Sequence, residues 1–191
     1  MEITIITIKN KKIEDFAEER NLALSAVERG EWVLFLDSDE IMSSELETEI
    51  RNLKPDREVN GYYIPRCGIV EERLLRLAKK GAGRWQRCVH EVWNVKGKIG
   101  YLKNPIIHEE EKSISEMVNK ANFYSTLHAR ANKHEGKKSS LLKIILFPLL
   151  KFPQTFFVKK AYKKGTRGLV FSIFQSFQSF LSWTKLYFLR S

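Results

Sequence analysis

The stretch GEWVLFLDSDE, residues 30–40, limits what this chain can fold into more than any other part of it. Five apolar residues in a row are followed by three acidic residues within four positions. A continuous apolar run of this length is typical of a strand that is buried on both faces, as in the middle of a parallel sheet. The acids that follow repel one another unless a positive group lies beside them. We therefore expect a central, parallel strand with a ligand site at its carboxyl end, where open α/β sheets bind their ligands.

The N-terminal part of the chain alternates between predicted strands and helices. The spacing of apolar residues predicts strands at 3–8, 31–37 and 61–66 and helices at 13–30 and 43–53. Ser43 is a suitable N-cap for the second helix, because its hydroxyl can accept a hydrogen bond from the first turn. Residues 89–95 and 98–102 are predicted to form a hairpin around Lys96-Gly97. The alternation indicates an α/β fold.

The excess of basic residues lies entirely in the last third of the chain. Residues 136–191 hold 11 Lys or Arg and no acid, whereas residues 1–135 hold 22 basic and 23 acidic residues. Residues 113–134 are predicted to be one amphipathic helix, whose inward-facing residues are Ile114, Met117, Val118, Ala121 and Tyr124. We expect two parts: an α/β domain over residues 1–110 and a helical region over residues 111–191.

The helical region carries a second amphipathic segment, residues 168–184, which contains no charge. Phenylalanine and aliphatic residues fill one side of it, and serine and glutamine fill the other. This segment is shorter than the ~20 apolar residues that cross a bilayer. The apolar run upstream is interrupted by Lys143, Pro148, Lys151 and Pro153. Because a basic cluster at 159–167 precedes the uncharged segment, we expect the region to lie on an anionic membrane surface.

Two other partners for the helical region stay open. Its apolar side would pack equally well on the α/β domain or on a partner chain, for example in a homo-oligomer. Nucleic acid is disfavoured, because the basic residues alternate with aliphatic residues and phenylalanine and form no compact stacking platform. Cys67 and Cys88 form no CxxC pair, and the first residues carry no signal-peptide pattern. We therefore expect a cytoplasmic protein, peripheral on the inner face of the cell membrane.

Asp37 and Asp39 form an Asp-x-Asp pair at the end of the predicted central strand. Two carboxylates at this edge can share one hard divalent cation, Mg²⁺ or Mn²⁺, together with phosphate oxygens of a substrate. The ion would be the missing positive charge, and it would also stabilise a departing diphosphate. The alternative is that Asp37, Ser38 and Asp39 only form a turn that caps the next helix.

Two segments of the chain resemble the family 2 glycosyltransferases, inverting enzymes of GT-A fold. The first is DFAEERNLALSAVERGEWVLFLDSDE, in which an Arg-Asn pair, Arg20 and Asn21, precedes a strand that ends in Asp-Ser-Asp-Glu. The second is GRWQRCVHEVW, which is similar to the pattern G-x-W-x-x-x-V-H-E. The combination is most similar to the branch that synthesises the lipopolysaccharide core and other cell-envelope glycans.

The resemblance implies a role for each matching residue. Asp37 and Asp39 would hold the metal, and the nucleotide sugar would be bound by Arg20, Asn21, Asp37, Ser38 and Asp39. Glu91 would be the general base that takes a proton from the acceptor hydroxyl. The acceptor or sugar would contact Trp85, His90 and Trp93, and His108 is an additional candidate ligand. The alternatives are structural: Glu91 as an exposed hairpin residue, the tryptophans as core, the histidines as hydrogen-bonded residues, and Arg20 as the partner of Glu18 or of the acidic cluster.

The chain departs from the family at its N-terminus. The family begins with a strand–helix–strand unit that reads the nucleotide base, and Met1 lies near the end of where that unit should be. The function that we expect is the transfer of a sugar from a nucleotide-diphosphate sugar to a hydroxyl of a cell-envelope glycan or lipid-linked acceptor. The alternative is an inactive, truncated relative that binds a membrane or a partner, or a subunit that borrows the missing strands.

Overall fold

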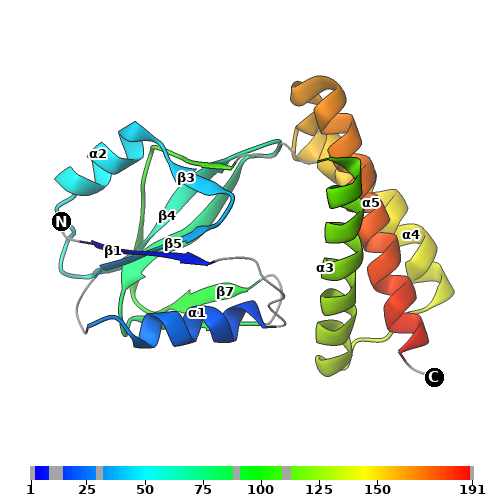
Figure 1. Cartoon of the computed structure of the whole chain (residues 1–191), viewed down its shortest axis with the longest axis horizontal. Coiled ribbons are helices and arrows are strands. Elements are labelled where there is room, and N and C mark those ends of the chain that lie inside the picture. The colour runs from blue at the N-terminus through cyan, green and yellow to red at the C-terminus, as the bar shows by residue number, and fades with distance from the viewer. Residues whose placement is uncertain (1–2, 9–14, 29–31, 88–90, 109–112, 190–191) are drawn as a thin grey trace. The chain divides into compact units, whose positions relative to one another are not determined.

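The computed structural model describes residues 3–8, 15–28, 32–87, 91–108 and 113–189 (Figure 1). The chain divides into two compact units, residues 1–110 and residues 111–191. The first unit is mixed α/β, as the sequence predicts, with a curled sheet, and the second is helical.

The first unit contains nine strands and two helices among its described residues. Its strands are β1 (Ile3–Ile8), β2 (Trp32–Asp37), β3 (Glu40–Met42), β4 (Val59–Cys67), β5 (Glu72–Lys79), β6 (Gly83–Gln86), β7 (Val92–Val95), β8 (Lys98–Tyr101) and β9 (Ile106–His108). Its helices are α1 (Phe16–Ser25) and α2 (Ser44–Asn52). The predicted strands and helices of this part are therefore confirmed, with helix α1 shorter than expected at both ends.

Seven strands form one mixed sheet, in the order β1-β2-β5-β4-β9-β3, with β8 paired to β4 beside this path. Strand β2 is an interior strand beside the edge strand β1 rather than the central strand that was expected, and it is parallel only to β1 and runs antiparallel to β5. The expectation of a purely parallel environment was therefore wrong. A buried strand needs apolar residues on both faces whichever way its neighbours run, so the apolar run carries no information about direction.

The two faces of β2 explain its apolar run. Trp32, Leu34 and Leu36 pack with α2 residues in one core cluster, whereas Val33 and Phe35 pack with α1 residues in another. Figure 1 shows α1 and α2 on opposite sides of the sheet. The alternation of a strand also places Asp37, the last residue of β2, on the same side as Val33 and Phe35, facing α1.

Helix α2 begins at the predicted N-cap. The Ser43 hydroxyl accepts a hydrogen bond from the Leu46 amide at 3.1 Å. Helix α1 is capped in the same way by Asp15, whose carboxylate accepts a hydrogen bond from the Glu18 amide at 2.9 Å. Both caps satisfy amides that a first helical turn leaves without a partner.

The predicted hairpin around Lys96-Gly97 is wrong. Strand β7 pairs back with β6 in a separate two-stranded sheet, whereas β8 pairs in parallel with β4. The chain does turn at Gly97, whose φ of +95° favours glycine. The Asn60 side chain donates a hydrogen bond to the Lys96 carbonyl at 2.9 Å, which helps to direct the chain toward β4. A turn residue alone does not tell which strand its neighbours will join.

The second unit consists of α3 (Ile114–His134), α4 (Leu141–Pro153), a π-helical turn η1 (Gln154–Val158), a 3₁₀ turn η2 (Ala161–Lys164) and α5 (Gly165–Phe188). Helix α5 packs against both α3 and α4. Helix α3 begins with a capping box, in which the Ser113 hydroxyl accepts from the Glu116 amide and the Glu116 carboxylate accepts from the Ser113 amide.

Two expectations for the helical unit were wrong. Pro148 does not interrupt the upstream apolar run, because α4 continues through it. Together α4 and η1, Leu141–Val158, form a helix that is long and apolar enough to cross a membrane by length and composition. Helix α3 leaves Ile114 and Val118 exposed rather than inward, although Ala121 is buried as predicted. On α5 the serine side is the buried one, which the sequence alone had left open.

Candidate active site

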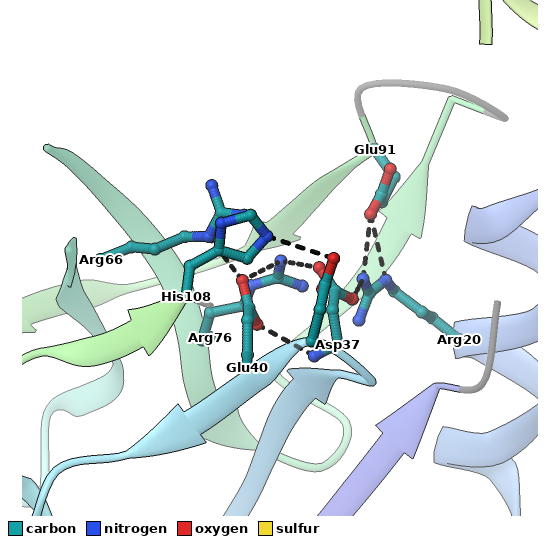
Figure 2. Close-up of polar contacts among 8 residues, drawn as sticks. Arg20, Asp37, Glu40, Arg66, Arg76, Glu91 and His108 are labelled. Carbon is teal, nitrogen blue, oxygen red and sulfur yellow. Dashed lines mark hydrogen bonds and ion pairs between the residues drawn. The ribbon is translucent and has the colours of Figure 1, made fainter. Parts of the chain in front are cut away.

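The acidic cluster at the end of β2 is surrounded by arginines (Figure 2). Arg20 on α1 lies with Nη2 2.5 Å from Asp37 Oδ1, and Arg76 on β5 lies with Nη2 2.7 Å from Asp37 Oδ2. Both arginines are buried, so these are ion pairs with little access to water. Arginine side chains therefore supply the positive charge that the sequence requires at this position.

Glu40, the third acid of the cluster, is also buried and paired. Its Oε1 lies 2.6 Å from Arg66 Nε on β4 and 3.6 Å from Arg76 Nη2. Its Oε2 accepts a hydrogen bond from the Asp37 amide at 2.9 Å. Glu40 thus ties the loop after β2 to the neighbouring strands, and it fixes the backbone that presents Asp37.

The arginines set the protonation of Asp37. Burial works against the charged form of its carboxyl, but Arg76 and Arg20 outweigh burial, so the pKa of Asp37 lies below its ordinary value of 3.8. Burial also works against the charge of Arg76, yet Asp37 and Glu40 hold the Arg76 pKa above its usual range. Asp37 and Arg76 are therefore both charged at neutral pH.

Arg20 also reaches the β6–β7 hairpin. Its Nη2 and Nε donate to Glu91 Oε1 at 3.0 and 3.2 Å, and Figure 2 shows this bridge between Asp37 and Glu91. The guanidinium carbon lies 4.6 Å from the centre of a Trp85 ring, a cation–π distance. Because the Arg20 side chain is only 1% exposed, the arrangement favours the alternative in which Arg20 pairs with the acidic cluster.

Asn21 connects α1 to the same hairpin by hydrogen bonds. Its side-chain amide donates to the Trp85 carbonyl at 2.9 Å and accepts from the Trp85 amide at 3.0 Å. Strand β6 also lies close to its partner strand, because a side chain at Gly83 would meet the Asn94 carbonyl at 2.3 Å. The residues of the two matching motifs, Arg20-Asn21 and Gly83-x-Trp85, therefore meet in space.

The predicted sugar-binding tryptophans lie in the core. Trp85 and Trp93 are 4% and 2% exposed, stack on each other at 5.1 Å, and meet Phe35 edge-on. A sugar has no exposed ring face to stack on in this arrangement, so it favours the alternative in which both rings are core. His90, the third predicted contact, lies outside the described residues.

Asp39 differs from Asp37 in its surroundings. Its Oδ2 lies 3.2 Å from His108 Nε2, and Ser38 beside it is exposed. No group of three His, Cys, Asp or Glu side chains among the described residues is placed to hold a metal ion. Asp37, whose two oxygens both face arginines, does not fit a metal, whereas Asp39 fits as one ligand with His108 beside it.

Two residues of the cluster, Arg66 and Arg76, were missed from the sequence, and Glu40 was recognised as one of its acids but was given no role. A signal existed for Arg76, because an arginine inside the apolar run RLLRLA on a buried strand requires an acidic partner. Arg66 had no such signal, since it stands near the end of its strand, where a charged residue is common.

Sequence comparison finds relatives that are named glycosyltransferases. A Rickettsia conorii protein described as an uncharacterized glycosyltransferase is 29% identical in an alignment of 180 positions that covers 82% of this chain and 64% of the relative. A Rickettsia prowazekii protein with the same description is 29% identical over 82% of this chain and 62% of its own length. The lipopolysaccharide core biosynthesis glycosyltransferase LpsC of Rhizobium meliloti is 26% identical over 90% of this chain and 69% of its own.

No family model matches the chain. The chain spans 64% and 62% of the length of the two Rickettsia relatives. The mixed α/β unit with its curled sheet is compatible with an α/β glycosyltransferase fold, and the names of the relatives support a transferase role.

Proposed function

We propose that this chain belongs to an inverting glycosyltransferase of the family 2, GT-A type. It would transfer a sugar from a nucleotide-diphosphate sugar to a hydroxyl of a cell-envelope glycan or a lipid-linked acceptor. The main support is the bridge that Arg20 forms between Asp37 and Glu91, because it holds a half-buried carboxylate beside the carboxyl end of β2. The names of the relatives support the same reaction class.

Glu91 is the proposed general base. Arg20 holds its Oε1, and within the described part of the chain no hydrogen bond reaches its Oε2. Oε2 would take the proton of the acceptor hydroxyl while the acceptor oxygen bonds to the anomeric carbon of the donor. The bond from that carbon to the diphosphate breaks, and its electron pair leaves with the nucleoside diphosphate.

Ser38 and Asp39 are the proposed contacts to the donor diphosphate, because both lie at the carboxyl end of β2 and are less buried than Glu40. Arg20 and Asn21 would act by holding the site together rather than by touching the nucleotide. If Mg²⁺ or Mn²⁺ binds, Asp39 would hold it with diphosphate oxygens, and His108 is the nearest additional ligand. A bound ion would neutralise charge on the departing diphosphate.

The test is the release of nucleoside diphosphate from a panel of nucleotide sugars, with envelope extracts as acceptor and with Mn²⁺ added. Glu91→Gln should lower the rate about a hundredfold or more, the usual range for a lost general base. Glu58→Gln, at an exposed position of the same unit, is the matched control and should leave the rate unchanged. An active protein whose rate survives Glu91→Gln would contradict the assignment of the base.

A second candidate is a binding protein without activity. It is favoured by the pairing of both Asp37 oxygens with arginines, which also serves a purely structural cluster. The two candidates differ in donor binding. If the protein neither binds nor turns over any nucleotide sugar while it remains folded, the second candidate replaces the first.

A further inference from the structure

Helix α5 buries mainly small residues and exposes most of its large apolar ones, unlike a helix of a water-soluble bundle. The residues of α5 that are buried are Gly168, Ser172, Ser182 and Leu186. The large apolar residues on the same helix point outward, and those most exposed are Leu169, Ile173, Phe177, Phe180, Tyr187 and Phe188. Small residues between helices with large apolar residues outside are typical of helices that face lipid.

The hydroxyl groups of the buried serines form hydrogen bonds within the protein. Ser172 Oγ donates to the Gly168 carbonyl at 2.7 Å, and Ser182 Oγ donates to the Gln178 carbonyl at 2.8 Å, both within α5. Gly168 allows the backbones to approach, because a side chain there would meet the Ala161 carbonyl at 1.8 Å. The small side of α5 is therefore a tight and satisfied contact between helices.

Helix α4 extends the same pattern. None of its residues is buried, and along Leu141–Val158 only Thr155, in η1, is. Leu142, Ile145 and Leu149 follow the spacing of one helical face and are each 60% or more exposed. A contiguous apolar surface of this kind is costly in water and marks an interaction site.

Charge indicates what covers this surface. The basic connection, residues 159–167, comprises the link between α4 and α5 and the first residues of α5, and it carries five exposed basic residues, Lys159, Lys160, Lys163, Lys164 and Arg167. Among residues 113–191 the acids are Glu116 and Glu135 alone, and both precede α4 in the chain. A strongly basic connection beside an apolar surface matches the anionic headgroups and acyl chains of a bilayer such as the cytoplasmic leaflet.

We propose that the outer apolar faces of α4 and α5 insert into the interface of an anionic lipid bilayer, while the basic connection at residues 159–167 contacts lipid phosphates. In this proposal α4 is the main inserted element, although from the sequence its apolar run was expected to be interrupted by lysines and prolines. The α4–η1 helix, at about 1.5 Å per residue, is close to the thickness of a hydrocarbon core. Lys151, however, stands in the middle of this helix and would be placed in the hydrocarbon core of a spanning arrangement, so the pair lies along the surface.

The first experiment is flotation of the full chain with vesicles of phosphatidylglycerol and phosphatidylethanolamine, and with vesicles of phosphatidylcholine alone. The protein should float with the anionic vesicles and bind less as salt rises. Replacing Leu142, Ile145 and Leu149 by glutamine should weaken vesicle partitioning about a hundredfold, because three apolar side chains leave the lipid. The matched control replaces Leu22, Ile41 and Val92, exposed residues of the first unit.

A second set of variants tests the basic connection. Replacing Lys160, Lys163 and Lys164 by glutamine should weaken binding at low salt by about a hundredfold, at roughly 1 kcal/mol for each lysine near an anionic surface. The control changes the net charge equally, by replacing three exposed residues of the first unit, Lys54, Arg57 and Arg84. Circular dichroism of every variant establishes that the helices remain folded.

Insertion is measured separately with brominated lipids. Trp183 is the only tryptophan of residues 113–191 and lies against Phe147 of α4 at 4.7 Å, whereas the other three tryptophans are buried in the first unit. Brominated acyl chains should therefore quench Trp183 fluorescence. Absence of flotation or of quenching, or unchanged flotation of the apolar variant, would overturn the proposal. If the protein forms a dimer in vesicle-free solution and the apolar variant abolishes that dimer, the partner of this surface is a second copy of the chain. If the protein binds RNA or DNA in a salt-sensitive way and does not bind vesicles, the partner is a nucleic acid.

Discussion

Asn21 and Trp85 hold each other by two reciprocal hydrogen bonds, one in each direction between the Asn21 side-chain amide and the Trp85 backbone. Asn21→Ala removes both and leaves two backbone groups of a half-buried strand without partners. We expect a loss of about 1–3 kcal/mol in the free energy of unfolding, measured by urea denaturation. Leu22→Ala, on the exposed side of the same helix, should change it by less than about 0.5 kcal/mol.

Asn21→Asp separates the two hydrogen bonds. Aspartate can still accept from the Trp85 amide but cannot donate to the Trp85 carbonyl. This variant should therefore be intermediate in stability between Asn21→Ala and the original protein. Equal stability of the two variants would show that only the bond to the carbonyl matters.

Arg20→Lys tests the bridge between Asp37 and Glu91. Lysine keeps the charge but carries it on one compact ammonium group, whose three donors do not reproduce the planar fork that reaches Asp37 and Glu91 with Nη2 and Nε. Breaking a buried ion pair on one side costs about 3–5 kcal/mol, and lysine should recover part of that cost relative to Arg20→Ala. If Glu91 is the base, kcat should fall in both variants while KM for the donor changes little.

The variants Asp37→Asn and Asp39→Asn should show that Asp37 stabilises the fold and that Asp39 binds the donor. The first removes a carboxylate that faces two buried arginines, and it should lower the melting temperature clearly. The second removes a partly exposed carboxylate and should leave the melting temperature nearly unchanged while weakening the binding of Mn²⁺ and of the donor diphosphate. Equal effects of both variants on Mn²⁺ binding would favour the Asp37–Asp39 pair as joint ligands.

The Asp37 pKa makes a prediction about acid stability. Because the folded-state pKa lies below the ordinary 3.8, the ionised carboxyl stabilises the fold above that value, and this stabilisation is lost as pH falls through the lowered folded pKa. The difference in unfolding free energy between the original protein and Asp37→Asn should be constant above about pH 5 and should shrink at lower pH. A difference independent of pH would contradict the paired, ionised state of Asp37.

Gly168→Ala tests the packing of α5. The new side chain would meet the Ala161 carbonyl, so the turn η2 must shift, and we expect a loss of about 1–3 kcal/mol in stability. Leu169→Ala, at the next and exposed position, is the control. The stability of both variants is measured by thermal unfolding, followed by the circular dichroism signal of helices at about 222 nm.

Local features of this fold could be predicted from the sequence. The apolar run of β2 predicted that this strand is buried, and Ser43 predicted the start of α2. Both features depend on residues that are close together in the chain. The partner of β7 could not be predicted in this way. Trp93 of β7 packs on Trp85 of the preceding strand and on Phe35, which lies far earlier in the chain, and these contacts leave no periodic signal in β7 itself.

The same limit applies to the site and to α5. The spacing of serine and phenylalanine shows that α5 has two different sides, but it does not say which side faces protein. The matching motifs brought Arg20, Asn21, Trp85 and Glu91 to attention, and the structure brings these four together. The sequence did not reveal that Asp37 pairs with Arg76 as well as with Arg20, because the pair of Asp37 and Arg76 joins β2 to β5 across the sheet.

The internal hydrogen bonds of Ser172 and Ser182 have a practical consequence for handling the protein. Since these hydroxyls bond within their own helix, the contact between α5 and its neighbours does not rely on solvent. A mild detergent micelle can then replace the surrounding medium without competing for that contact. On the proposal that α4 and α5 contact a bilayer, purification in such a detergent should keep the three helices assembled, whereas detergent-free buffer should promote aggregation through the leucines of α4.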